Sequence, residues 1–525
     1  MKRRNFIKNT AVGAIMPKLF GSFGAEAVAL SPWLQTLTNA ATETDHVLVI
    51  IRLTGGNDGL NMVIPLDQYP NLSTARANVL INETAVLRLN GVTGTGLHPA
   101  MTGMQTLFNE GKLKIVQGVG YPNQNFSHFR STDIYMSASD AAQNVSTGWV
   151  GRYMSTEYPN YPSAFPNTTM PDPLAIQLNE MTLTFQGTAT TMGVTVTNPS
   201  NPYNFLDDNG NVLTGHMGKE LTYLRTIAKQ ADKYGETMKA AYERAANLVT
   251  YPTNNKLAEQ LKIVARLIKG GLKTRVYMVQ IGGSFDTHSG QVDTANHAIG
   301  THAALLQQVS EGITAFQRDL EAMRIQDRVL GMTFSEFGRR IKSNASSGTD
   351  HGASSASFVF GTRLFGGMLG TNPTIAATVD VNSNVPMQYD FRSIYASILQ
   401  DWFCVNSVDL QTIMLKNFQR LPIVNSASCI TAAHDLNVAA GLKLISNYPN
   451  PFSFSTTIDF VTQGGHTMVQ IFDVEGQLLA TPVDGEYLEG KYKVYFNGGY
   501  LPAGTYYARL QNGAISQVRS IVKVN

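Results

Sequence analysis

From His46 onward, short runs of β-branched and aliphatic residues alternate with longer stretches in which apolar residues recur at helical spacing. Short apolar runs bounded by glycine or polar residues are typical of buried parallel strands, and amphipathic stretches are typical of the helices that cover them. The alternation predicts an α/β fold with a doubly wound, mainly parallel sheet. The predicted strands are Val47–Leu53, Leu113–Val119, Val276–Ile281 and Val329–Phe334, and the predicted helices are Lys219–Val249, Lys256–Lys269 and His297–Arg324.

The pattern changes twice along the chain. Residues 144–215 are rich in Thr, Asn, Pro and Gly, which predicts an irregular insertion into the α/β domain of residues 46–425. Residues 426–446 have neither pattern and are interpreted as a linker. From residue 447 to residue 525 the chain consists of short alternating strands separated by glycine turns, which predicts a small all-β sandwich that folds by itself.

Residues 1–29 have the features of a targeting segment. Lys2, Arg3 and Arg4 form a basic head, and a mildly apolar stretch follows. The segment resembles a twin-arginine export signal, and an ordinary Sec signal is the open alternative. No later run of about 18 apolar residues occurs, so no transmembrane helix is expected.

Overall charge and cysteine content narrow the function classes. With 40 basic and 38 acidic residues the net charge is +2, which implies no nucleic-acid partner. The only cysteines, Cys404 and Cys429, exclude a disulfide scaffold and a multi-cysteine metal site. They permit one disulfide in an oxidising compartment, and the sequence leaves that pairing open.

Polar residues follow each predicted strand, where ligands bind in open α/β sheets. Asp58 follows the first strand in a glycine-rich turn, where it is also compatible with ordinary turn chemistry. Ser127, His128 and Arg130 follow the second strand and directly precede a helical pattern. A helix start favours anions, so Ser127 is a candidate nucleophile and Arg130 a candidate anion-binding residue. Ser127 is equally compatible with simple helix capping.

Carboxylate and imidazole groups occur together after the third and fourth strands. Asp286 and His288 follow the third strand, and Glu336, Asp350 and His351 follow the fourth, with glycines nearby. Asp oxygens and His nitrogens are common ligands of zinc and similar ions where cysteine is absent. We therefore expect both pairs to converge in one crevice around a divalent metal.

Other candidates have a less specific context. Arg339, in the same segment as Glu336, is a second candidate for binding an anion in a bidentate manner. His98 stands outside these clusters, and His297 and His302 fall in a helical pattern, where they fit structural roles.

Together, Leu53–Gly59, Ser127–Arg130, Phe285–His288, Ser335–Arg339 and Gly348–Gly352 resemble the motifs of the domain-of-unknown-function-1501 family. That family is usually grouped with the alkaline phosphatase and sulfatase superfamily. The resemblance implies two divalent metals and a Ser or Thr nucleophile at a helix start, here Ser127.

On that resemblance, Asp58, Asp350 and His351 would hold one metal, and Asp286 and His288 would hold the other. No histidine lies between Gly352 and Ala433, where the superfamily commonly supplies one. One metal site is therefore incomplete, filled by Glu336, or absent.

The final segment carries a second resemblance. Its opening string, Asn447-Tyr448-Pro449-Asn450-Pro451-Phe452, and the strands that follow resemble the C-terminal sorting domains of type IX secretion clients. The resemblance implies contact with the type IX secretion machinery and passage through the periplasm to the cell surface or the medium.

Two functions fit these observations. The first is a secreted metal-dependent hydrolase of phosphate or sulfate esters, which implies an anionic ester substrate. The second is a non-catalytic cell-surface binding or scaffold protein that retains the hydrolase fold.

Overall fold

The computed structural model describes residues 45–200, 234–405, 407–425, 443–473, 477–512 and 515–524. The predicted export signal, most of the predicted linker and Cys429 lie outside these ranges. The described residues fall into two compact units, one of residues 45–426 and one formed by the C-terminal segment.

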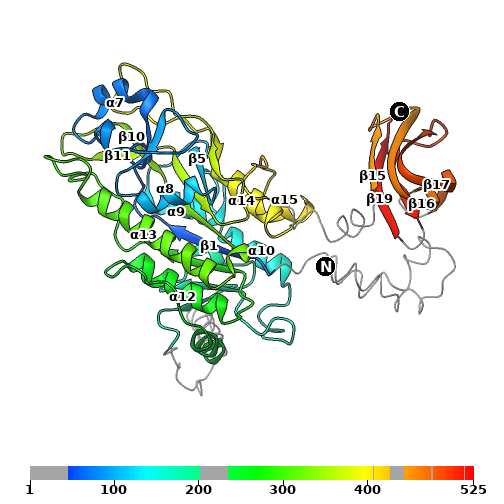
Figure 1. Ribbon diagram of the computed structural model, residues 1–525, viewed down its shortest axis with the longest axis horizontal. Coiled ribbons are helices and arrows are strands. Elements are labelled where there is room, and N and C mark those ends of the chain that lie inside the picture. The colour runs from blue at the N-terminus through cyan, green and yellow to red at the C-terminus, as the bar shows by residue number, and fades with distance from the viewer. Residues whose placement is uncertain are drawn as a thin grey trace. The chain divides into compact units, whose positions relative to one another are not determined.

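A nine-stranded sheet forms the centre of the α/β unit (Figure 1). Its order is β13-β5-β12-β9-β1-β8-β6-β7, and β14 pairs with β5. Only the two pairings of β12 are antiparallel, so all the other strands run in one direction. The strands are β1 (Val47–Arg52), β5 (Leu113–Gly120), β6 (Ala175–Leu178), β7 (Val194–Val196), β8 (Val276–Gln280), β9 (Val329–Phe334), β12 (Ser355–Phe360), β13 (Gly367–Leu369) and β14 (Tyr389–Asp390).

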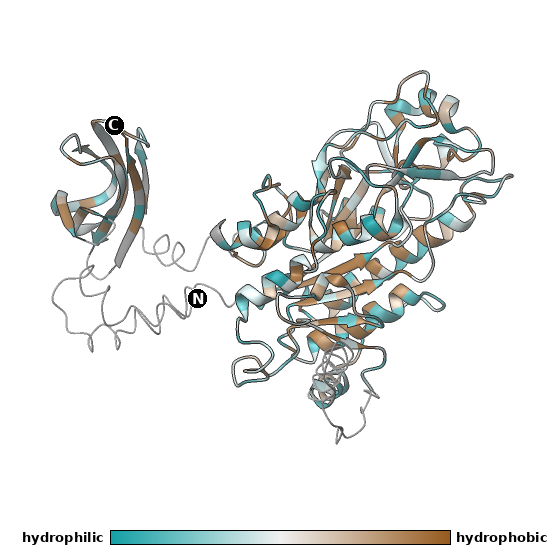
Figure 2. Cartoon of the chain, turned by 180° about the vertical axis from the view of Figure 1, so that it is seen from behind, coloured by the Kyte–Doolittle hydropathy of each residue, from teal (hydrophilic) through white to brown (hydrophobic). Residues whose placement is uncertain are grey.

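Both faces of this sheet are buried under helices, as β1 illustrates. Val47, Val49 and Ile51 belong to one hydrophobic core, whereas Leu48 and Ile50 belong to the core on the other face. Burying each such side chain stabilises the fold by about 1.5–3 kcal/mol. The first core includes side chains of α8 (Thr102–Asn109), α12 (Lys256–Lys269) and α13 (Thr301–Ala322), and the second includes side chains of α9 (His128–Ser137), α10 (Trp149–Glu157) and α14 (Phe391–Asp401). The apolar strands between these helices are brown in Figure 2.

The predicted doubly wound α/β fold is confirmed, and the four predicted strands form with ends that differ by at most one residue. The helix predicted at His297–Arg324 begins only at Thr301, because Gly300 adopts a φ of 122° that a helix does not permit. Of the helix predicted at Lys219–Val249, residues 234–244 are helical, and residues 219–233 lie outside the described ranges.

The segment predicted to be an irregular insertion, residues 144–215, is more regular than its composition suggests. Its described part contains α10 and also β6 and β7, which form one edge of the main sheet. These strands have only four and three residues, which is too short to show a strand period among Thr, Pro and Gly residues.

Shorter elements complete the α/β unit. They are α6 (Gly59–Met62), β2 (Val63–Pro65), η2 (Leu66–Gln68), α7 (Tyr69–Arg76), η3 (Glu83–Ala85), β3 (Leu87–Arg88), β4 (Thr95–Leu97), η4 (Leu183–Phe185), η5 (Gln326–Arg328), β10 (Gly338–Ser343), β11 (Thr349–Gly352) and α15 (Ser407–Met414).

Cys404, one of the two cysteines of the chain, is disulfide-bonded.

The C-terminal unit is all β. It is one antiparallel five-stranded sheet, in which the long strands β16 and β17 pair along their length. The sheet curves around its own core of residues such as Phe452, Phe460 and Phe496 (Figure 1). The strands are β15 (Lys443–Tyr448), β16 (Ser455–Phe472), β17 (Leu478–Asn497), β18 (Gly504–Asn512) and β19 (Ile515–Lys523).

Among the described residues, no helix combines the length and the apolar character that a membrane span requires.

Candidate metal centre

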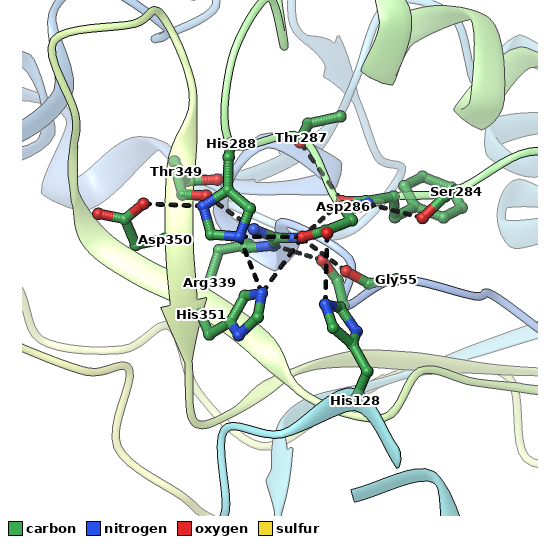
Figure 3. Close-up of polar contacts among 12 residues, drawn as sticks. Gly55, His128, Ser284, Asp286, Thr287, His288, Arg339, Thr349, Asp350 and His351 are labelled. Atoms are coloured by element: carbon green, nitrogen blue, oxygen red, sulfur yellow. Dashed lines mark hydrogen bonds and ion pairs between the residues drawn. The ribbon is translucent and has the colours of Figure 1, made fainter.

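Four loops meet beyond the carboxyl ends of β1, β5, β8 and β9, because these strands run in the same direction. The loop after β5 leads into α9, whose first residue is His128. The loop after β8 carries Asp286 and His288, and the β10–β11 hairpin after β9 carries Asp350 and His351. The structure thus brings together the two Asp and His pairs that are some 60 residues apart in sequence (Figure 3).

The Asp286 carboxylate lies among three imidazole rings. Its Oδ1 is 3.1 Å from Nε2 of His288 and 3.2 Å from Nε2 of His351, and its Oδ2 is 3.3 Å from Nε2 of His128. The Nε2 atoms of His288 and His351 are 2.9 Å apart. All three histidines therefore present the same ring nitrogen to one carboxylate, as Figure 3 shows.

The other ring nitrogen of each histidine is held by an oxygen. Nδ1 of His128 lies 3.1 Å from the Glu336 carboxylate, and Nδ1 of His288 lies 2.9 Å from the Asp350 carboxylate. Nδ1 of His351 lies 2.8 Å from the Phe126 carbonyl. These oxygens can each accept a hydrogen bond from Nδ1–H, and a ring in that tautomer directs its Nε2 lone pair inward.

The convergence of lone pairs fits a metal ion. Two unprotonated Nε2 atoms 2.9 Å apart repel each other unless a cation or a proton lies between them. Ligands about 2.1 Å from a zinc ion are about 3.4 Å apart in a tetrahedron, close to the 2.9–3.3 Å found here. Nε2 of His128 is buried and has no hydrogen-bond partner among the described residues.

The same donor set stands out among the described residues. His128, Asp286 and His351 are the one group of acidic, His or Cys side chains there whose ligand atoms all lie within 4.8 Å of one another. His288 adds a fourth donor. The residues present therefore fit a single divalent ion with nitrogen and oxygen ligands.

The pKa shifts of Asp286 and His351 favour cation binding, and that of His128 opposes it. Burial raises the pKa of the Asp286 carboxyl, but the hydrogen bond and charge of Arg339 outweigh it, so the net pKa is below the ordinary value. Burial lowers the pKa of His351, which favours its neutral form. The hydrogen bond to Glu336 raises the pKa of His128. A metal ion would compete with that proton.

Glu336 and Asp350, predicted as metal ligands, occupy supporting positions. Glu336 is buried and accepts hydrogen bonds from His128 and from the backbone N–H of Gly55 at 2.8 Å. Asp350 is bound to His288 and to the Asn344 amide at 3.1 Å. Both carboxylates orient a histidine, and such contacts fix the ring and raise its basicity.

Asp58 is placed differently from its predicted role as a ligand. It is fully buried, and its two oxygens accept hydrogen bonds from Arg76 at 3.1 and 2.5 Å. It also receives the Leu60 N–H at the start of α6. With both oxygens bound to a guanidinium, this carboxylate stabilises a buried charge.

The two arginines predicted to bind an anion are also engaged. Arg339 is buried and donates to the carbonyls of four residues and to Asp286 at 2.7 Å. Arg130 donates to carbonyls of residues 140, 141 and 143 beyond the far end of α9. Arg339 therefore contacts the cluster through Asp286, and its other donors are used by carbonyls, whereas Arg130 makes no hydrogen bond to the cluster among the described residues.

Ser127 is the N-cap residue of α9, immediately before His128. It is exposed, and its hydroxyl makes no capping hydrogen bond to the helix. Its backbone N–H donates to the Asn125 side chain at 2.8 Å. The hydroxyl is therefore exposed and not used for capping, in the residue that precedes His128.

His98, His297 and His302 have structural contacts. His302 is buried and lies 2.9 Å from the Asn57 side chain, and its ring packs against His98. His297 lies 2.9 Å from the Leu80 carbonyl. Sequence reasoning did not identify His128 as a ligand. The available signal was its position in the segment after a predicted strand, which Asp286 and His288 share.

Comparisons with known proteins agree with the organisation into two units. The family model described as "Protein of unknown function (DUF1501)" matches residues 46–409. The model described as "Secretion system C-terminal sorting domain" matches residues 446–524. No curated protein matches the chain.

Three solved structures illustrate how distant the structural likenesses are. A protein of the alkaline phosphatase superfamily from Vibrio parahaemolyticus has 8% identity and a TM-score of 0.32, and the superposition covers 93% of this chain and 84% of the Vibrio chain. The lipoteichoic acid synthase LtaP from Listeria monocytogenes has 7% identity and a TM-score of 0.30, and the superposition covers 72% of this chain and 76% of the synthase. A structure from glycosaminoglycan metabolism of Bacteroides thetaiotaomicron has 8% identity and a TM-score of 0.33, covering 91% and 89%. At these scores the likenesses carry no argument about this chain.

Proposed function

The chain belongs to the DUF1501 family of proteins of unknown function, and we propose that its α/β unit binds one divalent metal ion and hydrolyses a phosphate or sulfate ester outside the cytoplasm. The observation that carries the proposal is the convergence of three histidine Nε2 atoms on the Asp286 carboxylate. A divalent ion held there would polarise the ester oxygen and stabilise the charge that develops on it.

Ser127 is the proposed nucleophile. Its hydroxyl belongs to the residue before His128 and is not used to cap α9. The first N–H groups of this ten-residue helix lie beside it, and a helix start favours negative charge on an attacking oxygen and on a bound ester. The motif resemblance to hydrolases with a Ser or Thr at a helix start supports the same role.

Arg340 is the proposed anion-binding residue, in place of Arg130 and Arg339. Its guanidinium lies 5.0 Å from the ring of Phe126, whose carbonyl binds His351. It donates to the Asn382 carbonyl and makes no ion pair with a described carboxylate. Its charge is therefore not matched by a described carboxylate, which would leave it to bind an anionic ester.

A non-catalytic binding role is the second candidate. The single cluster favours it, because Asp58, implied as a ligand of a second metal, is bound to Arg76 instead. In that case the α/β unit would bind a metal and an anion without turnover.

The sorting domain supports export of the chain. We propose that type IX secretion carries it to the cell surface or the medium. The twin-arginine or Sec signal proposed for crossing the inner membrane lies in residues outside the described ranges.

Steady-state hydrolysis by the purified full-length chain tests the proposed activity. 4-Nitrophenyl phosphate and 4-nitrophenyl sulfate are supplied to the protein as purified, after chelation, and after zinc or manganese is restored. We expect turnover of one ester that disappears on chelation and returns with metal. Metal binding without turnover of either ester would favour the non-catalytic role.

A further inference from the structure

A buried glutamine lies beneath the metal centre and touches both loops that carry its ligands. Gln291 is fully buried. Its Oε1 accepts the Thr349 hydroxyl at 2.7 Å and the Thr287 hydroxyl at 3.1 Å, and its Nε2 donates to Asp58 at 2.7 Å. One amide group therefore satisfies three polar side chains from three segments of the chain.

The Asp58–Arg76 pair fixes which way this amide points. Asp58 is a carboxylate whose oxygens accept from Arg76, so it offers Gln291 only an acceptor. The Gln291 NH₂ group must then face Asp58, and its oxygen must face the two threonines. The buried Asp58–Arg76 pair thus keeps the Gln291 oxygen directed at the hydroxyls of Thr287 and Thr349.

The two threonines are next to the metal ligands in sequence. Thr287 lies between Asp286 and His288, and Thr349 directly precedes Asp350 and His351. Both threonines are buried, and the Thr349 N–H donates to the Thr287 carbonyl at 3.1 Å. A backbone hydrogen bond therefore ties the two ligand-bearing loops, and the shared Gln291 oxygen links them a second time through the two hydroxyls.

We infer that Gln291 is a positioning residue for the metal centre: it clamps the loop of Asp286 and His288 to the hairpin of His351 through the Thr287 and Thr349 hydroxyls. The inference rests on the metal binding in the proposed function. It assigns Asp58 and Arg76 to the support beneath the centre, and it requires no direct contact between Gln291 and the ion.

Thr349→Val tests the clamp with the smallest change, because valine keeps the shape of threonine and removes the hydroxyl. Thr349→Ser restores the hydroxyl. Thr184→Val is the matched control, because Thr184 is equally buried and its hydroxyl has no hydrogen-bond partner among the described residues. The readouts are the zinc dissociation constant of the full-length chain, from chelator competition, and the melting temperature of the metal-free protein.

The clamp predicts that Thr349→Val weakens zinc binding by about 10–100-fold, the usual effect of losing support around a metal ligand. Thr349→Ser and Thr184→Val should bind zinc as the wild type does. If Thr349→Val lowers only the melting temperature and binds zinc normally, the hydroxyl merely stabilises the fold and the inference is overturned.

The same titrations separate this inference from the proposed function. A wild type that binds zinc but hydrolyses no ester leaves the clamp standing and contradicts only the hydrolase. A wild type that binds no zinc contradicts both.

Discussion

His128, Asp58 and Arg339 show how residue types acquire roles from their contacts. His128 becomes a candidate ligand because α9 begins at that residue and Glu336 binds its Nδ1. Asp58 and Arg339 had equally suggestive positions in the sequence, but Asp58 is paired with Arg76, and Arg339 is bound by backbone carbonyls and by Asp286. Folding brings these partners together, and the local sequence pattern does not reveal them.

At the residue scale, Ser127→Ala tests the nucleophile. We expect turnover of the aryl ester to fall by on the order of 10³-fold or more, because the attacking oxygen is removed. Metal content should stay unchanged, since the Ser127 hydroxyl makes no hydrogen bond to a ligand among the described residues. Steady-state kinetics and elemental analysis of the same preparation measure both. Retained turnover would reassign the nucleophile.

Arg340→Ala tests anion binding, with Arg340→Lys as the conservative variant. Losing a charge-assisted contact costs about 1.5–3 kcal/mol, so KM for the aryl phosphate or sulfate should rise about 10–100-fold. Lysine should restore part of the affinity. Arg130→Gln is the control, because Arg130 binds backbone carbonyls at the other end of α9. An unchanged KM in Arg340→Ala would exclude Arg340 from the site.

At the element scale, the sequence predicted the buried strands well because their apolar runs are long and uniform. It predicted the edge strands β6 and β7 poorly because strands of four and three residues leave no period to detect. β6 pairs with β8, a neighbour some 100 residues away in sequence, and β7 pairs with β6. The ligand loops were found because they follow the long strands.

The packing of α8 against α13 includes an ion-pair network with a predictable pH dependence. Hydrogen bonds from Arg318 and Lys112 lower the pKa of Glu110 to about 2 from its ordinary 4.5. A lowered folded-state pKa adds stability that is present above pH 4.5 and is lost as the pH falls towards 2. The contribution is about 1 kcal/mol or less, because Glu110 is partly exposed.

Glu110→Gln should therefore lower the free energy of unfolding at pH 6 and have little effect near pH 2, measured by urea denaturation. Glu311→Gln on α13 is the control, because Glu311 is exposed and accepts only from Gln307. An equal loss of stability at both pH values would show that packing, not charge, is responsible.

At the scale of the whole molecule, the change of pattern near residue 426 was visible because helical and strand periods differ. The described residues form separate compact units, each with its own core. Removing residues from Lys443 onward, where β15 begins, should leave an α/β unit that unfolds cooperatively at nearly the wild-type temperature. It should also remain in the periplasm of its host, because the sorting domain is lost. An insoluble or non-cooperative product, or continued secretion, would contradict this division of roles.

The metal content of the purified full-length chain tests the central claim most directly. Plasma mass spectrometry should find about one divalent ion per wild-type chain. A variant in which His128, His288 and His351 are all alanine should contain none, whereas His466→Ala, in the C-terminal unit, should match the wild type. A wild type without a divalent ion, or a triple variant that retains it, would contradict the account.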